Sequence, residues 1–414
     1  MNHQIPTEQL LDLADRYGTP LFVYDAGIMK KQYDRLCNAF KGQRVKFNYA
    51  CKALGNLNVM RLFKNMGTGL DTVSIEEVKL GLMAGFEPQE ILFTPNCVDI
   101  GEIAEAVELG VQINIDNLSV LEQFGGRYGD SVPVCVRINP HIMAGGHQKI
   151  STGHIDSKFG ISIHQVRHLQ RIIKHYSIRV NGLHMHTGSD ILDVDVFLRG
   201  AQILLDLAFE FEDLEYIDFG SGFKVPYRPG EKGTNVEELG QKMGAMFKDF
   251  CNQYGKELSL VFEPGKWLVS EAGYFLAKVN VIKHTTATVF AGVNTGFNHF
   301  IRPMFYDAYH HILNLSNPLG TERIYTVVGY ICETDTFAWD RPLPEVREGD
   351  ILCFLNAGAY LYSMASNYNA RLKPAEVLLY GGTDYLISRR QTLDDLLATT
   401  LDCSKIFENQ LYEH

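Results

Sequence analysis

The sequence predicts an α/β fold in which a (β/α)8 barrel of the TIM type is joined to a mainly β C-terminal domain. Two observations carry this prediction. Through the first two thirds of the 414 residues, eight short apolar runs alternate with longer amphipathic runs, which matches the strand count and length of such a barrel. Beyond Gly265 the pattern changes to short strand-like runs with turn-rich spacing, which indicates a mainly β domain.

The eight predicted barrel strands are rich in Val, Ile, Leu and Phe. Parallel strands covered by helices have this composition because both of their faces are buried. An open, doubly wound sheet shows the same alternation and is the alternative on pattern alone. The predicted strands span residues 45–52, 69–74, 91–95, 111–117, 132–140, 180–188, 215–222 and 258–265.

Amphipathic stretches between these strands predict the covering helices. Ser74, followed by Glu76 and Glu77, is a typical helix N-terminus because its hydroxyl can cap the first turn. The predicted helices span residues 57–64, 74–84, 101–109, 164–175, 194–211 and 236–253.

The second domain is expected to use both ends of the chain. Strand-like runs occupy residues 274–283, 286–293, 323–331, 350–355 and 375–380, and an early run at 21–24 can add a strand to them. We therefore expect a barrel over residues 36–270 and a β domain built from residues 1–35 and 271–414.

Composition excludes several classes of protein. The chain has 38 Lys and Arg against 49 Asp and Glu, a net charge of −11, which argues against binding to nucleic acid or an anionic membrane. Eight scattered cysteines without a CxxC pair argue against a zinc ribbon and a disulfide framework. No apolar run approaches the roughly 18 residues of a membrane span, and the N-terminus lacks the features of a signal peptide. We expect a cytoplasmic protein.

Polar residues at the predicted strand ends indicate a cofactor. Lys52 ends the first strand, where partial burial would favour a neutral, nucleophilic amine. A Gly220-Ser-Gly222 turn offers backbone N–H groups to a phosphate, and Glu263 could face a cationic ring nitrogen. Each residue alone has an ordinary explanation: a solvated lysine, a tight turn, a loop carboxylate. Together a lysine, a phosphate site and an acid meet the needs of pyridoxal 5'-phosphate.

At this level of detail the chain resembles the alanine-racemase-fold decarboxylases that depend on pyridoxal 5'-phosphate, and among them the diaminopimelate decarboxylases. The resemblance covers nearly the whole chain, and the order and spacing of its short motifs are specific. The matching motifs are YGTPLFVY at 17–24, STGHIDSKFG at 151–160, HTGS at 186–189, EPG at 263–265, IRPMFY at 301–306, CETD at 332–335, GAY at 358–360, SNYN at 366–369 and PAEV at 374–377.

The resemblance implies a role for each residue of the site. Lys52 would hold the cofactor covalently, His186 would lie against its ring, and Glu263 would bind its pyridine nitrogen. Cys332 would be the general acid that returns a proton to Cα; the ordinary alternative for it is a small buried apolar residue. The implied phosphate-binding residues are Ser189, Gly222, Glu263, Pro264, Gly265, Lys266 and Tyr360, and the implied substrate-binding residues are Lys266, Arg302, Tyr306, Glu333 and Tyr368, the last of which would also approach the cofactor.

The implied reaction is decarboxylation of meso-2,6-diaminopimelate to L-lysine and CO2, the last step of lysine biosynthesis, by a homodimer with shared sites. Arg302 can hold the distal carboxylate in a bidentate manner, and Glu333 can pair with the distal ammonium. Two rivals stay open: carboxynorspermidine decarboxylation, and a catalytically silent homologue that acts by binding. The chain also departs from the family, with Lys266 in place of the usual Arg and Gly220-Ser-Gly222 in place of the usual glycine run. Lys lacks the planar fork of Arg, which leaves the part of Lys266 in substrate binding open.

Overall fold

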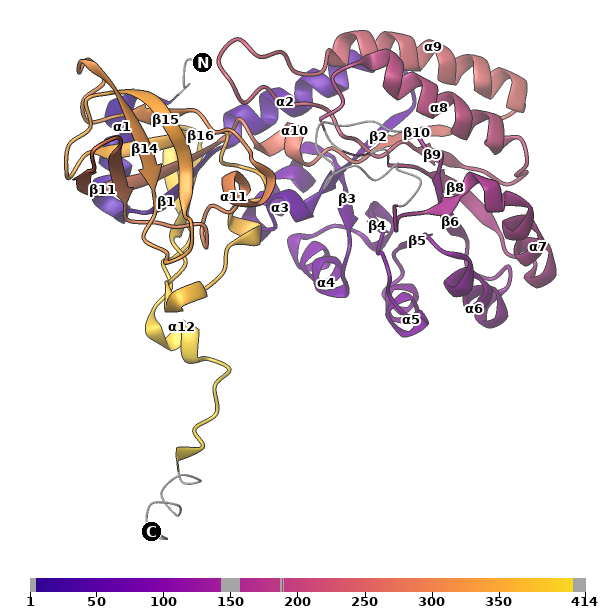
Figure 1. The fold of residues 1–414 in the computed structure, drawn as a ribbon. Coiled ribbons are helices and arrows are strands. Elements are labelled where there is room, and N and C mark those ends of the chain that lie inside the picture. Colours follow the sequence, from indigo (N-terminus) through magenta and orange to yellow (C-terminus); the bar gives the residue numbers. More distant parts are fainter. Residues whose placement is uncertain (1–4, 143–156, 187, 189, 405–414) are drawn as a thin grey trace.

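The computed structural model describes residues 5–142, 157–186, 188 and 190–404. It contains a closed barrel of eight parallel strands, which confirms the predicted fold class (Figure 1). The ring runs β5-β4-β3-β2-β10-β9-β8-β6 and closes through pairing of β5 with β6. Its strands are β2 (Val45–Ala50), β3 (Gly69–Thr72), β4 (Ile91–Phe93), β5 (Gln112–Ile115), β6 (Val134–Asn139), β8 (Val180–His184), β9 (Tyr216–Asp218) and β10 (Ser259–Phe262).

All eight strands that the sequence predicts are present. They are shorter than the apolar runs, because the polar end of each run leaves the sheet to form the mouth of the barrel. A two-residue strand, β7 (Ile161–Ser162), pairs with β6 beside the ring. Phe47 of β2 stacks on Phe262 of β10, with ring centroids 6.0 Å apart, so these two neighbouring strands are packed by large apolar side chains.

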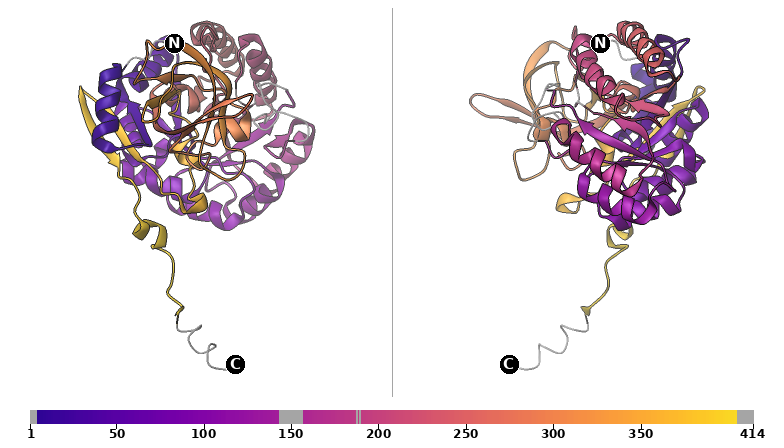
Figure 2. Two further views of the ribbon diagram at one scale, coloured as in Figure 1. Left: turned by 60° about the vertical axis from the view of Figure 1, so that its left-hand side comes forward. Right: turned by 90° about the vertical axis from the view of Figure 1, so that its right-hand side faces the viewer.

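Helices lie on the outer side of these strands (Figures 1 and 2). The six predicted helices are present, and Ser74 caps its helix by accepting the N–H of Glu77 at 3.2 Å. Two covering helices were not predicted, α2, which packs against α9, and α6. The helices are α2 (Ala26–Ala39), α3 (Leu57–Met66), α4 (Ile75–Ala84), α5 (Ile100–Glu108), α6 (Leu118–Tyr128), α7 (Val166–Tyr176), α8 (Val194–Ala208) and α9 (Val236–Tyr254).

The second sheet combines the two ends of the chain. Strand β1 (Leu21–Asp25) lies between β11, to which it is antiparallel, and β17, to which it is parallel, so the early run at 21–24 does join this sheet. Its order is β15-β14-β12-β11-β1-β17-β18, with β13 and β16 attached through β11. The strands are β11 (Gly273–His284), β12 (Val289–Val293), β13 (Ile312–Asn314), β14 (Glu322–Val328), β15 (Thr336–Pro344), β16 (Ile351–Leu355), β17 (Ala375–Tyr380) and β18 (Thr383–Ser388).

Four further helices lie outside the barrel ring: α1 (Thr7–Tyr17), α10 (Lys266–Val269), α11 (Arg302–Tyr306) and α12 (Leu393–Leu397). Residues 398–404, which follow α12, extend away from the rest of the molecule (Figures 1 and 2). Within the described ranges, every helix is too short or too polar to cross a membrane.

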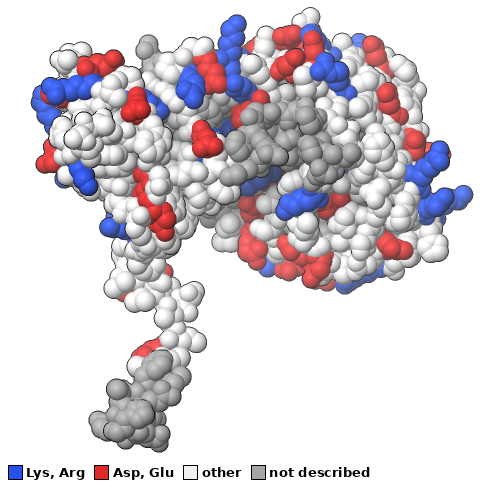
Figure 3. Space-filling model, in the orientation of Figure 1, with Lys and Arg blue, Asp and Glu red and all other residues white. Residues whose placement is uncertain are grey.

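Basic and acidic side chains are interspersed on the surface drawn in Figure 3. On the described part of that face no continuous basic surface is visible, in keeping with the acidic balance of the whole sequence.

Candidate active site

A cavity of about 610 Å³ opens where the barrel strands end and is also lined by the β domain. A second, smaller cavity of about 30 Å³ lies next to it, among the strand ends. The two share Lys52, His186, Lys266 and Tyr360 as lining residues. Four of the residues predicted for the site therefore lie around one continuous space.

Lys52 follows β2 in a short 3-10 turn (Cys51–Ala53) that turns the chain out of the barrel. Its Nζ lies 2.8 Å from Oδ2 of Asp71, at the adjacent strand β3. Burial alone would lower the pKa of Lys52, as the sequence suggested, but the carboxylate of Asp71 raises that pKa above its ordinary value. The amine must lose a proton before it can attack a carbonyl, and Asp71 is an acceptor within reach.

Asp71 is buried and is held by more than the lysine. Thr94, after β4, donates its hydroxyl to Oδ1 of Asp71. Burial and the nearby Glu263 raise the pKa of Asp71 to about 7. A carboxyl group with a pKa near neutrality can both accept and return a proton at working pH.

His186 lies beside the glycine turn after β9. The backbone N–H of Ser221 donates to its Nδ1 at 3.2 Å. Burial, with help from the cations Arg137 and Lys52, lowers the pKa of His186 to about 3, so the ring is neutral. Gly220 makes this approach possible, because it has a positive φ of 61° and a Cβ there would lie 2.4 Å from Nδ1.

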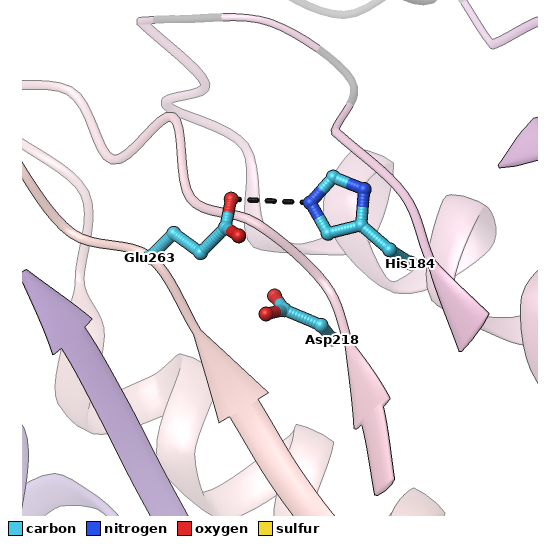
Figure 4. Close-up of side chains that lie close together, drawn as sticks. All are labelled: His184, Asp218 and Glu263. Carbon is cyan, nitrogen blue, oxygen red and sulfur yellow. Dashed lines mark hydrogen bonds and ion pairs between the residues drawn. The ribbon is translucent and has the colours of Figure 1, made fainter. Parts of the chain in front are cut away.

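Glu263 follows β10 and lines the smaller cavity. Its Oε2 accepts a hydrogen bond from Nε2 of His184 at 3.1 Å (Figure 4). Burial alone would raise the pKa of Glu263, but the interaction with His184 and the charge of Lys52 hold it at about 2. Its other oxygen, Oε1, is buried without a hydrogen-bond partner among the described residues. A carboxylate of this kind suits a ring nitrogen that carries a proton.

The glycines that bound the smaller cavity leave room for a compact polar group. Gly222 has a φ of 104°, and a Cβ there would lie 2.1 Å from the carbonyl oxygen of Gly188. Gly265 also lines this space, whereas Pro264 does not. The carbonyl of Pro264 accepts the N–H of Ala50 at 3.3 Å. Ser189, the remaining predicted phosphate ligand, lies outside the described residues.

The wider cavity presents cations to its contents. Arg302 is only 8 % exposed, and its Nε has no hydrogen-bond partner in the described part of the chain. Its guanidinium lies 5.2 Å from the ring of Tyr227 and 5.9 Å from that of Tyr306. Lys266 forms an ion pair with Asp190 on the same wall. Arg228 also lines this cavity without an ion pair among the described residues, but it is exposed, so Arg302 is the buried guanidinium that an anionic group of a substrate would meet.

Cys332, Glu333 and Tyr368 form a separate, exposed cluster on the β domain. Tyr368 donates its hydroxyl to Oε1 of Glu333, and this bond lowers the pKa of Glu333. Asn369 donates to Sγ of Cys332 at 3.3 Å. These three predicted residues do not line either of the two cavities that the described residues of this chain form around Lys52.

Sequence reasoning assigned no role to three buried residues of the barrel mouth: Asp71, His184 and Asp218. A usable signal was present for each, because all three are ionisable and stand within or at the end of an apolar strand. Such residues are rarely buried without a partner.

A lysine, a neutral histidine, a partly unsatisfied buried carboxylate and a glycine-lined hollow on a (β/α)8 barrel define a pyridoxal-phosphate enzyme. The family model for the pyridoxal-binding domain of pyridoxal-dependent decarboxylases matches residues 26–270. The free carboxylate oxygen of Glu263 and the glycine-lined cavity beside Lys52 also fit pyridoxal 5'-phosphate, which, when bound, supplies an electron sink for the pair left on Cα when CO2 departs.

The chain belongs to the diaminopimelate decarboxylase family. It is 41% identical over 398 residues to the diaminopimelate decarboxylase of Methanothermobacter thermautotrophicus, covering 94% of this chain and 92% of the relative. A crystal structure of diaminopimelate decarboxylase superposes with a TM-score of 0.89 at 32% identity, over 100% of this chain and 99% of the other. The Helicobacter pylori diaminopimelate decarboxylase complexed with L-lysine gives a TM-score of 0.86 at 30% identity, over 94% and 98%.

Proposed function

We propose that this protein decarboxylates meso-2,6-diaminopimelate to L-lysine and CO2, the last step of lysine biosynthesis. The observation that carries the proposal is Arg302. It is a buried guanidinium with an unpaired Nε in the cavity that also contains Lys52. A substrate with a second carboxylate satisfies this cation, whereas a simple diamino acid would leave it buried and unpaired.

The cofactor would be held by residues of the barrel. Lys52 would bind its aldehyde, His186 would lie against its ring, and Glu263 would accept the proton of its pyridine nitrogen. Its phosphate would occupy the hollow beside Gly222 and Gly265, with Ser189, Tyr360 and the backbone from Glu263 through Pro264 to Lys266 as further ligands. The neutral state of His186 and the ionised state of Glu263 support these roles.

The protein would recognise the substrate by its distal carboxylate and ammonium groups. Arg302 would hold the distal carboxylate, with Tyr306 beside it on the same wall. Glu333, kept ionised by Tyr368, would pair with the distal ammonium. Cys332 would deliver the proton that replaces CO2 at Cα, since a thiol is a competent acid close to neutral pH.

We also propose a homodimer, because Cys332, Glu333 and Tyr368 are exposed and do not line the cavity of their own chain. In a twofold dimer each subunit could supply them to its partner. The test is to mix Lys52→Ala with Cys332→Ala protein after dissociation. Mixed dimers would regain one intact site in two, about a quarter of wild-type activity for random mixing. No recovery above the two variants alone would contradict shared sites.

A cytoplasmic location is part of the proposal. The eight cysteines are free thiols, as a reducing compartment requires.

The reaction itself is tested by measuring CO2 release from meso-2,6-diaminopimelate and from carboxynorspermidine with the same preparation of holoenzyme. We expect turnover of the first to dominate. Preference for carboxynorspermidine would contradict the proposal and indicate a decarboxylase of polyamine synthesis. Cofactor binding without turnover of either compound would favour a silent homologue.

A further inference from the structure

Behind Glu263, three ionisable side chains come from the ends of three adjacent barrel strands. They are His184 of β8, Asp218 of β9 and Glu263 itself after β10, with exposed fractions of 1%, 0% and 6%. One polar atom from each lies within 4.8 Å of the others. In Figure 4 the carboxyl groups of Asp218 and Glu263 face one another, while His184 approaches Glu263 from the other side. Only Glu263 lines the smaller cavity, so His184 and Asp218 support it from behind.

The hydrogen bonds of this cluster leave two carboxylate oxygens unsatisfied, besides Nδ1 of His184. Oε2 of Glu263 receives Nε2 of His184 at 3.1 Å, and Oδ1 of Asp218 receives the N–H of Gly220 at 2.8 Å. Oε1 of Glu263 and Oδ2 of Asp218 are both buried and have no partner among the described residues. Two ionised carboxylates so placed would repel one another, because burial leaves little solvent to screen their charges. One proton on one of them turns the repulsion into a hydrogen bond.

We propose that Asp218 is a carboxylic acid that donates its Oδ2–H to Oε1 of Glu263, and that it acts with His184 as a positioning residue for the cofactor's ring nitrogen. The second half of this inference rests on the proposed function. In keeping with this geometry, burial and the charge of Glu263 raise the pKa of Asp218 well above its ordinary value.

The proton belongs on Asp218 and not on Glu263 because their other partners differ. Glu263 receives the His184 ring and lies near Lys52, both of which favour its charged form. Asp218 receives one backbone N–H and faces negative charge. The other ionisable groups of the surrounding strands make no hydrogen bond to the two unsatisfied oxygens within the described ranges, and the cation among them that interacts with both carboxylates, Arg137, favours the charged form of each. These groups are Lys46 of β2, Asp71 of β3, Cys135 and Arg137 of β6 and Tyr216 of β9.

Two donors on Glu263 have a chemical consequence. Hydrogen bonds to a carboxylate stabilise its charged form and so lower its basicity. When a pyridine nitrogen faces Glu263, the proton between them then stays on the ring nitrogen, where it assists electron withdrawal from Cα. Asp218 and His184 therefore act through Glu263 and do not touch the cofactor.

The first test needs neither cofactor nor substrate. An infrared difference spectrum of the apoprotein, wild type minus Asp218→Asn, should show the C=O stretching band of one protonated carboxylic acid, and this band should shift in D2O. Asp116→Asn is the matched control. Asp116 is a buried carboxylate after β5 whose oxygens already accept the amides of Asn96 and Asn117, so this variant should retain the band. Because Asp71, with a pKa of about 7, can contribute an acid band of its own, the outcome is read in the difference spectrum. Absence of an acid band from the spectrum of wild type minus Asp218→Asn would overturn the proposal.

The second test compares two substitutions at one position in the holoenzyme. In Asp218→Asn the amide can donate to Glu263 and accept from Gly220, as the neutral acid does, so the ¹⁵N chemical shift of labelled cofactor should stay that of a protonated ring nitrogen. Its kcat should stay within about threefold of wild type. In Asp218→Ala the shift should move toward the unprotonated value, and kcat should fall about ten- to a hundredfold, the scale for losing a hydrogen bond to a charged group.

If Asp218→Asn is as impaired as Asp218→Ala, or does not fold, Asp218 acts as an anion and the proposal fails. A stoichiometric divalent metal in the purified holoenzyme would also overturn it, because a metal would use the same two oxygens. Failure of the substrate assignment has a different signature: the infrared and ¹⁵N results would stand while diaminopimelate was not consumed.

Discussion

Replacing Arg302 with Met tests how the substrate is recognised. Arg302 is 8 % exposed, so solvent screens little of its interaction with a carboxylate. Truncating one partner of a buried, hydrogen-bonded charge pair costs about 3 to 5 kcal/mol, which corresponds to a roughly 150- to 5000-fold loss in kcat/KM for meso-2,6-diaminopimelate. The fold should tolerate the change, because Nε of Arg302 has no hydrogen-bond partner in the described structure to lose. The melting temperature should therefore not fall.

Inhibition constants separate lost recognition from general damage. L-Lysine retains the carboxylate that Arg302 would bind, whereas cadaverine is the same chain without it. The Arg302→Met enzyme should bind L-lysine at least tenfold more weakly and cadaverine with unchanged affinity. Arg228→Met is the matched control, since Arg228 lines the same cavity but stacks 4.3 Å from the ring of Tyr309, and it should change both constants less than threefold. Equal weakening of both inhibitors by Arg302→Met would refute the reasoning.

Three further predictions concern the cofactor site and stability. Lys52→Ala should remain folded but lose the visible absorbance of bound cofactor and all decarboxylation, as read by spectrum and CO2 release; retained turnover would exclude Lys52 as the cofactor's anchor. Gly222→Ala should bind cofactor at least tenfold more weakly in a fluorescence titration, because its Cβ would lie 2.1 Å from the carbonyl oxygen of Gly188; wild-type affinity would remove the phosphate from this turn. Burial lowers the pKa of His310 from 6.5 to about 3. Between these two pH values the His310 side chain therefore binds a proton in the unfolded chain but not in the native state. The contribution of His310 to stability is then complete above pH 6.5 and is lost by up to about 1.4 kcal/mol per pH unit as the pH falls toward 3. His310→Gln should flatten the pH dependence of urea unfolding over this range, and an unchanged slope would contradict the argument.

The barrel strands could be predicted because a strand that is buried on both faces consists mainly of apolar residues, which form a short continuous run in the sequence. Helix α6 could not be predicted from the sequence, since Gly125 and Gly126 lower its helix propensity. The structure supplies the reason for one of them: a Cβ on Gly125 would lie 2.7 Å from the side chains of Tyr176 and Ile178. Close packing between helices outweighed local preference there, and only the fold could reveal it.

Strand β15 was missed for a related reason. Its Pro342 and Pro344 read as turn residues, yet both are tolerated because β15 lies at the edge of the sheet. At the site, the ends of strands indicated Lys52 and Glu263. The side chains that set the charge of Lys52 and Glu263 come from neighbouring strands. Which side chains meet depends on the register between adjacent strands, and this register could not be predicted from the sequence.

The departure at Lys266 shows how the site can keep its selectivity after losing an arginine. Lys266 is 8 % exposed, and a lone buried ammonium would be costly. Its ion pair with Asp190 removes that cost and leaves this part of the wall with no net charge. Neutralised in this way, Lys266 attracts a distal carboxylate far less than a free guanidinium would, so we expect recognition of the second carboxylate to fall mainly on Arg302. Arg228 also lines the cavity and has no ion-pair partner among the described residues, but its guanidinium stacks on the ring of Tyr309. The inhibitor comparison between Arg302→Met and Arg228→Met therefore shows which of the two guanidinium groups recognises the carboxylate.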